Sequence, residues 1–470
     1  MDGSLSARLT DGQSTLANPA SEKLPTELLA EIFKQARPDD KSDAYTNNHP
    51  TALAGVCRQW RGAALSTAAL WSSIFIIENS AEERKAARIN LERSGETAPL
   101  FLTWFSMAEQ FDADPQNVMN EFIIPYCNRW QRITLFTNEG DLADKLNAVM
   151  RTLDFEVLQD LEIFCTSSRL SPSGPTLCLS APLLHRCRLM EVPSLPPLPS
   201  NLVVLDCQLT MGRERFNLDP LLEFLPHVAH SLEHLRFGLP IPDVSATPRQ
   251  LRITLQNLKT LLICNSHNIM KHILAPNLTY FDASYYIEPD MQEVARMFYG
   301  FTAPKLQSIR FSNTPLRPLL DLNHLPSMFP QLKSVVFKGC GDESAFINFL
   351  EPPKGQEAEN PFPKLEELAI SNLADWTSLQ AAIEKRLENG GQSLRVIHLP
   401  KGDETGPIMG QLTNWLPKQG IEPVLYEPRQ LRMPTPPEFQ DDFFDEESHL
   451  FAMIRERLED EMEGIEEDDN

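Results

Sequence analysis

A short apolar motif recurs through most of this chain and restricts its fold more than any other feature. The motif is apolar-x-x-apolar-x-apolar, and it occurs eleven times between Trp130 and Leu399, at intervals of 18 to 33 residues that average about 26. Its first positions are Trp130, Leu158, Leu184, Leu202, Leu232, Leu258, Leu278, Leu306, Leu332, Leu365 and Leu394. A period in the twenties is typical of stacked repeats, each of which is too small to bury its apolar side chains alone.

Each motif predicts a strand, because its apolar residues alternate with residues that point to the opposite face. Several intervening segments have apolar residues three and four apart, which predicts helices. These segments are Asp219 to His230, Pro289 to Phe298, Ser344 to Leu350 and Thr377 to Asn389. Strand and helix in each repeat predict an α/β solenoid, leucine-rich-repeat-like, with a curved parallel sheet and outer helices. An unrelated α/β fold with parallel strands remains the alternative.

Two apolar stripes at helical spacing lie upstream of the repeats, after a polar arm at 1–20. The first stripe is Leu24, Leu28, Leu29, Ile32 and Phe33, and the second is Leu53, Val56, Cys57, Trp60 and Ala64, closed by Leu70 and Trp71. So short a helical unit does not bury this many large side chains alone, and the segment has no disulfide or metal pattern. The stripes therefore indicate a protein partner, with packing inside a small helical hairpin as the alternative.

The same segment resembles an F-box. The resemblance rests on three blocks in order, which are Leu24-Pro25-x-Glu27-Leu28-Leu29-x-x-Ile32-Phe33, Val56-Cys57-Arg58-x-Trp60-Arg61-x-x-Ala64 and Leu70-Trp71. It covers roughly residues 24–75, and the connector between the first two blocks is longer than the family's usual one. The resemblance implies a small all-α domain that binds the Skp-type adaptor of a cullin–RING ubiquitin ligase. It implies docking through Leu24, Pro25, Leu28, Ile32, Val56, Cys57, Trp60 and Leu70.

An F-box followed by irregular leucine-rich repeats, with an early Ser94-Gly95-x-x-x-Pro99-Leu100 segment, is similar to the large F-box families of mushroom-forming fungi. The asparagine usual in the turn of such repeats is not regularly present. The similarity implies a substrate-recognition subunit of an SCF-type ligase, which acts in protein degradation without catalytic residues of its own. A non-catalytic interaction scaffold that does not direct ubiquitin transfer is the alternative.

The expected organisation has five parts. Residues 1–20 are a disordered arm, 21–77 the F-box, and 78–126 a linker with a helix and a first strand. Residues 127–430 are the leucine-rich-repeat-like solenoid, and 431–470 an acidic tail. In that tail Leu450, Met453, Ile454 and Leu458 have helical spacing, which suggests a helix capping the last repeat.

The strand register predicts which side chains face the open side of the sheet. The basic ones are Arg132, Arg186, Arg188, Arg236, Arg310 and Lys338, and the acidic ones are Asp160, Glu162, Asp206, Asp282 and Glu367. Such a face is nearly neutral although the chain carries a net charge of −23, which favours a protein target over a phosphate-rich ligand. We expect target binding by Arg132, Arg186, Arg188, Arg236, Tyr280, Arg310 and Lys338, with an ordinary solvated face as the alternative.

Charge and hydropathy exclude several classes of partner. Residues 438–470 hold fifteen acids and two bases, and the rest of the chain is also acidic, so nucleic acid is not an expected partner. The longest apolar runs are too short to cross a bilayer, and no secretory signal is recognisable, so no membrane partner is expected. The eight cysteines form no C-x-x-C pair, which favours a reducing compartment, cytoplasmic and/or nuclear.

Motifs for catalysis and cofactors are missing from the sequence. It contains no phosphate-binding glycine loop, no H-E-x-x-H and no G-x-S-x-G, so no cofactor is expected. His227, His230 and His234 lie close together but have no acid or cysteine to complete a metal site. Cys187, between Arg186 and Arg188, is the one candidate nucleophile, and the repeat register points it inward. An enzyme would instead require a pocket in which polar groups converge.

Overall fold

The computed structural model describes the helices and strands of the chain with gaps between them. The described residues are 24–35, 49–77, 81–106, 115–137, 149, 152–165, 180–190, 199–208, 219–238, 252–265, 267–284, 301, 303–313, 328–340, 347, 350, 362–371, 376–389, 394–401 and 406–426. The chain forms two compact units, the first of residues 1–75 and 81–99 and the second of residues 76–80 and 100–470. They are called here the helical unit and the repeat unit, and each is described by itself.

The described residues of the helical unit form four helices and a 3-10 turn. These are α1 (Thr26–Gln35), α2 (His49–Val56), α3 (Arg58–Ser66), η2 (Ala68–Trp71) and α4 (Ala81–Arg93). Its core consists of Leu29, Phe33, Ala54, Ala63, Ala64, Leu70 and Trp71. The Trp71 indole N–H donates to the Ala64 carbonyl at 2.8 Å, and the Arg93 guanidinium lies 4.3 Å from the centre of the Trp71 ring. α4 lies within residues 78–126, where a linker helix is expected.

The second apolar stripe is divided between two helices. α2 ends at Val56 and α3 begins at Arg58, and Cys57 between them has extended backbone with φ −156° and ψ 174°. The Cys57 sulfur accepts from the Trp60 backbone N–H at 3.4 Å, so this residue caps the start of α3. Helical spacing alone does not reveal this break between α2 and α3, because the apolar side chains keep the same period on both sides of it.

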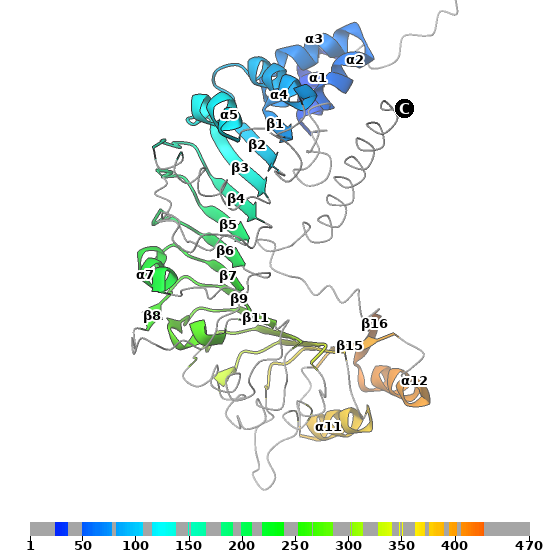
Figure 1. Cartoon of the computed structure of the whole chain (residues 1–470). Coiled ribbons are helices and arrows are strands. Elements are labelled where there is room, and N and C mark those ends of the chain that lie inside the picture. The colour runs from blue at the N-terminus through cyan, green and yellow to red at the C-terminus, as the bar shows by residue number, and fades with distance from the viewer. Residues whose placement is uncertain are drawn as a thin grey trace, which may run out of the picture. The chain divides into compact units, whose positions relative to one another are not determined.

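Fourteen strands form one sheet in which sequence order is spatial order, apart from the two short strands β8 and β10 (Figure 1). Every pairing from β2 to β16 is parallel. The strands are β1 (Ser73–Ile77), β2 (Leu100–Ser106), β3 (Trp130–Thr137), β4 (Asp160–Cys165), β5 (Arg186–Met190), β6 (Val204–Gln208), β7 (His234–Gly238), β9 (Thr260–Cys264), β11 (Tyr280–Ser284), β12 (Ser308–Ser312), β13 (Ser334–Lys338), β14 (Glu367–Ile370), β15 (Val396–Pro400) and β16 (Glu422–Tyr426). β8 (Ile253–Thr254) and β10 (Ile273–Leu274) pair separately.

The repeat unit is therefore an α/β solenoid with a parallel sheet, as the motif predicts. All eleven motifs coincide with strands, from β3 to β15. One buried column runs across the sheet through register-paired residues Leu161, Cys187, Leu205, Leu235, Leu261, Phe281, Ile309, Val335, Leu368 and Ile397. Because the same column is buried in every repeat, each strand must stay in register with the next. The segments between the strands are free to differ in length.

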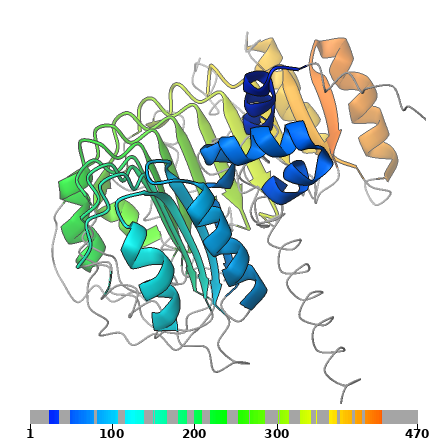
Figure 2. The ribbon, with the colours of Figure 1, turned by 90° about the horizontal axis from the view of Figure 1, so that it is seen from above.

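Helices cover the outer side of the curved sheet, where α7 and α11 lie in Figure 1, and the same layering is visible end-on in Figure 2. The helical segments of this unit are α5 (Pro115–Val118), η4 (Met119–Ile123), η5 (Ile124–Tyr126), α7 (Asp219–Val228), η6 (His267–Lys271), α11 (Trp376–Glu388), α12 (Gly406–Trp415) and η9 (Leu416–Gln419). The expected helices at Asp219 to His230 and Thr377 to Asn389 correspond to α7 and α11. Those at 289–298 and 344–350 fall outside, or almost wholly outside, the described residues, as do the arm and the acidic tail.

Polar side chains tie successive repeats together in the turn before the strand. The side chain just ahead of the first apolar position donates to a carbonyl in the equivalent turn of the preceding repeat. The pairs are Asn201 to Pro182 at 2.6 Å, Ser231 to Ser200 at 2.8 Å, Asn257 to His230 at 2.5 Å and Asn277 to Gln256 at 2.7 Å. These bonds satisfy turn carbonyls that the strands do not reach.

Candidate adaptor-binding and target-binding surfaces

Exposed apolar side chains concentrate in the helical unit. Among the described residues, large hydrophobic side chains that remain exposed are Leu28 (52%), Ile32 (46%), Val56 (61%), Leu65, Leu183 and Leu425. The first four lie on α1, α2 and α3. Leu28 and Ile32 are four residues apart and therefore share one face of α1. Leu29 and Phe33 lie about 100° further around α1 and pack in the core, so the exposed and the buried side chains occupy neighbouring faces of this helix.

The eight side chains predicted to dock an adaptor occupy three kinds of position. Pro25, Leu28, Ile32 and Val56 are exposed, and Leu24, Cys57 and Trp60 are partly buried. Leu70 is only 3% exposed and packs in the core, so its own side chain offers almost no surface. Trp60 packs against Phe33 with ring centres 5.0 Å apart, which gives it a structural role as well. Leu65 on α3, which lies outside the family's motif, is also exposed.

The sheet's open face is a ladder of ion pairs. Arg132 lies 3.3 Å from Asp160, and Arg186 lies 3.9 Å from the same carboxylate. Arg188 lies between Glu162 at 3.7 Å and Asp206 at 3.2 Å. Each of these partners comes from the neighbouring strand at the same level of the register.

Asp206 is the centre of that ladder. It is 1% exposed, lies 3.4 Å from Arg236 in addition to Arg188, and accepts from Gln208 at 3.0 Å. Charges paired in this way hold neighbouring strands in a defined register. Fewer of them are available to bind a ligand than their number suggests. The target-binding assignment of Arg132, Arg186, Arg188 and Arg236 has no direct test and stays a prediction.

The two ends of the open face differ in chemistry. Toward β2, the rings of Phe105, Phe136 and Phe164 stack face to face, with centres 4.4 and 4.6 Å apart. Toward β15, the His398 ring lies 2.7 Å from a Glu367 oxygen, and this hydrogen bond is the main reason why the pKa of Glu367 is lowered. The aromatic stack and the ion pairs are both cross-strand contacts, which become visible in the sequence only when the repeats are aligned one above another.

A third region lies between these ends, on β11 to β13. Tyr280 packs against Val204 and Leu262, and Arg310 lies 3.6 Å from Asp282. Burial raises the pKa of Asp282, and Arg310, Arg236 and Lys338 oppose this shift. Burial and the Asp282 charge also raise the pKa of Tyr280. Among the described residues no ion pair involves Lys338.

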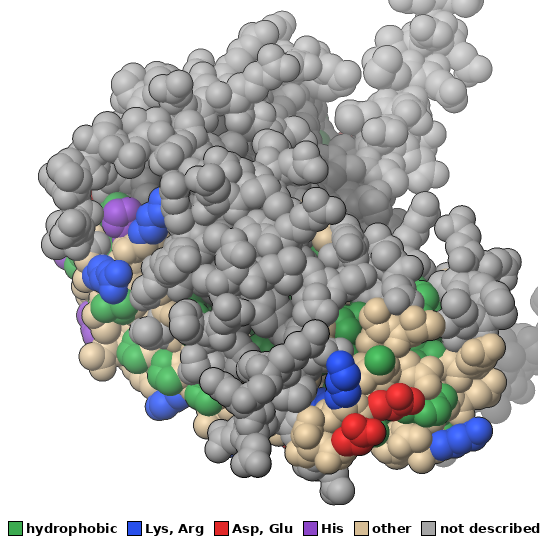
Figure 3. All heavy atoms as spheres, turned by 90° about the horizontal axis from the view of Figure 1, so that it is seen from below, with side chains coloured by type: hydrophobic (Ala, Val, Ile, Leu, Met, Phe, Trp, Pro, Cys, Tyr) green, Lys and Arg blue, Asp and Glu red, His purple; other side chains and the backbone are tan. Residues whose placement is uncertain are grey.

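Figure 3 shows the face of the molecule that is seen from below. There the hydrophobic side chains of the described residues are interspersed with lysine, arginine, aspartate and glutamate. No helix of the described part of the chain has the length and apolarity that a membrane crossing requires.

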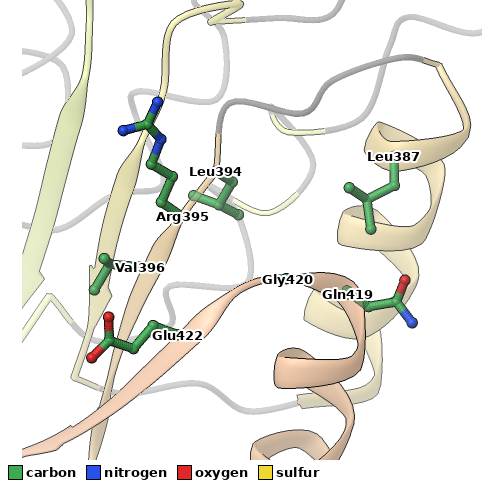
Figure 4. A pocket seen from close by; sticks show the side chains of 7 residues that line it. All are labelled: Leu387, Leu394, Arg395, Val396, Gln419, Gly420 and Glu422. Atoms are coloured by element: carbon green, nitrogen blue, oxygen red, sulfur yellow. The ribbon is translucent and has the colours of Figure 1, made fainter.

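A cavity of about 760 Å³ lies between the end of α11, the start of β15 and the turn into β16. Its lining is Leu387, Leu394, Arg395, Val396, Gln419, Gly420 and Glu422. In Figure 4 the charged ends of Arg395 and Glu422 point away from each other. The lining therefore lacks the convergent polar groups that bind and orient a small substrate.

The candidate nucleophile and metal ligands have no supporting geometry. Cys187 is fully buried, and burial, Asp206 and Glu162 raise its pKa, which opposes formation of a thiolate. Its side chain belongs to the core column. The described residues contain no group of three or more His, Cys, Asp and Glu side chains placed to hold a metal.

Comparison with known proteins identifies the helical segment. The F-box-like family model matches residues 21–77. The chain thus consists of an F-box-like domain followed by a long parallel-sheet repeat region consistent with leucine-rich repeats. No curated protein sequence matches the chain. A solved structure of a protein from Bacteroides fragilis aligns with 73% of this chain and 82% of its own length, at 12% identity and a TM-score of 0.28, values too low to indicate a shared fold.

Proposed function

We propose that this protein is the substrate-recognition subunit of an SCF-type cullin–RING ubiquitin ligase. Its F-box-like domain binds the Skp-type adaptor and through it the cullin, and the open face of its sheet binds a target protein. The observation that carries the proposal is the exposed set Leu28, Ile32 and Val56 inside the segment that matches the F-box-like family. Such side chains, left in water beside a closed core, are those that a protein interface buries.

The chain's part in ubiquitin transfer is positional. A receptor that holds a target near a ubiquitin-loaded enzyme raises the rate by proximity and needs no reactive side chain. The buried state of Cys187 and the ion-paired open face are both consistent with a binding role. The second candidate function, a scaffold that binds the adaptor without directing ubiquitin transfer, uses the same docking surface.

The proposal is tested by co-expression of the full chain with a Skp-type adaptor, followed by size-exclusion chromatography. We expect co-elution, and loss of co-elution in the Leu28→Asp/Val56→Asp variant. Because both side chains are exposed in the free chain, these changes leave the core intact. Trp60→Ala is a poorer test, since it also removes the contact with Phe33.

The matched control is Leu183→Asp, which introduces the same charge at a leucine that is 50% exposed on the repeat unit. It should leave co-elution unchanged. If the folded wild type elutes without the adaptor, or if Leu183→Asp is as damaging as the double variant, the docking assignment is wrong. Cullin co-purification with ubiquitylation of a captured target separates the receptor from the scaffold.

A further inference from the structure

The open face of β11, β12 and β13 forms a grid of nine side chains that differs from the rest of the ladder. Register pairs Tyr280, Ser308 and Ser334 in the first row, Asp282, Arg310 and Val336 in the second, and Ser284, Ser312 and Lys338 in the third. This set is called here the β11–β13 grid. Its central residue is Arg310, and four of the eight surrounding positions are serines. Small side chains around one long cation leave room beside it for a ligand group.

The grid carries more positive than negative charge. Arg310 and Lys338 face a single acid, Asp282, and Lys338 takes part in no ion pair among the described residues. The Arg310 side chain has three neighbours: its Nε lies 3.6 Å from Asp282 Oδ2 and 3.3 Å from Ser312 Oγ, and its guanidinium also interacts with the Tyr280 hydroxyl. A guanidinium has five N–H donors, so these neighbours do not use all of its capacity to bind a carboxylate.

The neighbouring ladder on β4 to β7 lacks this excess. There Arg188 and Arg236 are balanced by Glu162 and Asp206, and Arg188 contacts both acids. An anionic ligand at that level would have to displace an acid that is already in place. Charge complementarity therefore favours binding of a negatively charged ligand at the β11–β13 grid over binding at the β4–β7 ladder, although that ladder has more arginines.

The acid of the grid limits which anion fits. Asp282 is 9% exposed, and its Oδ1 is buried with no hydrogen-bond partner among the described residues. The side-chain carboxylate of a peptide brings a single negative charge to Arg310 and Lys338. A polyphosphate or a nucleic-acid backbone brings several negative charges, and the nearby Asp282 carboxylate opposes it more strongly.

We propose that the β11–β13 grid is the point where the open face binds its target, and that it takes the side-chain carboxylate of an acidic residue in a peptide segment of that target. This inference rests on the proposed function, since it names the ligand chemistry of the target-binding face. The Arg310 side chain is 16% exposed, so an ion pair formed there is screened little by water.

The test measures fluorescence anisotropy of a short labelled Gly-Ser-Ala peptide with one central Glu, titrated with the full-length protein. We expect binding that weakens at least about tenfold when the peptide Glu is replaced by Gln, and similarly in the Arg310→Met and Lys338→Met variants. The matched control is Lys333→Met, which removes the same charge from an exposed position just before the same strand. It should bind as the wild type does.

Three outcomes would overturn the assignment: no binding of the Glu peptide, equal weakening by Lys333→Met or Arg132→Met, or a phosphoserine peptide that binds more than about tenfold tighter than the Glu peptide. The last result would assign the grid to phosphate. Adaptor co-elution, measured on the same preparations, keeps the two proposals apart. Arg310→Met and Lys338→Met must still co-elute, and peptide binding without co-elution would reject the ligase role while leaving the peptide site in place.

Discussion

At the scale of single residues, the most consequential side chain is Asp206, because it neutralises two arginines while almost fully buried. Asp206→Ala leaves Arg188 and Arg236 without their shared carboxylate, and we expect a loss of about 3–5 kcal/mol in the free energy of unfolding of the repeat unit. Urea denaturation followed by circular dichroism measures it. Glu233→Ala, which breaks an ion pair with the exposed Lys259, should cost less than about 1 kcal/mol. Equal losses in the two variants would refute the special role of Asp206.

Asp282 makes the stability of the folded chain depend on pH, and the direction of its pKa shift fixes the sign of that dependence. Its pKa is raised mainly by burial, so the folded state binds this proton more tightly than the unfolded state. The resulting stability is present below the unfolded pKa and is lost as pH rises through the folded pKa. Asn cannot ionise, so we expect the stability of wild type relative to Asp282→Asn to fall as the pH rises above about 4. Urea midpoints of both proteins at each pH test this, and a constant difference would contradict it.

At the scale of elements, the α2–α3 junction depends on how Cys57 is used. Its thiol caps α3 through the Trp60 N–H, whereas the family motif counts the same residue as an adaptor contact. Serine is a better helix cap than a thiol, so Cys57→Ser should keep or raise the melting temperature of the domain. Cys57→Ala should cost about 1 kcal/mol. Thermal unfolding gives these values, and adaptor affinity separates the roles: weaker binding by a stable Cys57→Ser protein would assign the thiol to the interface.

The strands that carry the motif could be predicted because every repeat buries the same column, and this burial requires apolar residues at fixed spacing. The final strand β16 could not, since Glu422-Pro423-Val424 lacks the motif and proline argues against a central strand. The break at Cys57 and the turn ties of Asn257 and Asn277 also escaped prediction. They depend on backbone geometry and on the next repeat, neither of which a local period contains.

The candidate sites show the same limit. The sequence alone predicted which charged residues share the open face, and their register is confirmed from β3 to β15. It did not predict that Arg188 and Arg236 are neutralised by Asp206, or that Lys338 is left without an ion pair among the described residues. Those facts require the repeats to be stacked, because partners that lie 18 and 30 residues apart in the sequence become neighbours only across strands.

At the scale of the whole molecule, the last strand of an open parallel sheet has a free edge that must not pair with a strand of another chain. β16 is the last strand of the sheet formed by the described residues. The Glu422 N–H donates to Arg395 and the Tyr426 carbonyl accepts from Lys401, each at 2.7 Å, so Glu422, Val424 and Tyr426 bond to β15. Pro423 and Leu425 then direct their backbone groups away from the sheet. Proline has no N–H, and its place at that edge removes a donor that a second strand would need.

Restoring that donor should therefore promote association. We expect Pro423→Val to self-associate in a concentration-dependent way, measured by size-exclusion chromatography with light scattering, while the wild type, freed of adaptor, stays monomeric under the same conditions. Adding Leu425→Lys to that variant places a charge on the same edge and should return the monomer, because lysine blocks edge-to-edge pairing. A monomeric Pro423→Val protein at every concentration would show that the edge is closed by something other than this proline. Association that Leu425→Lys fails to reverse would place the contact elsewhere.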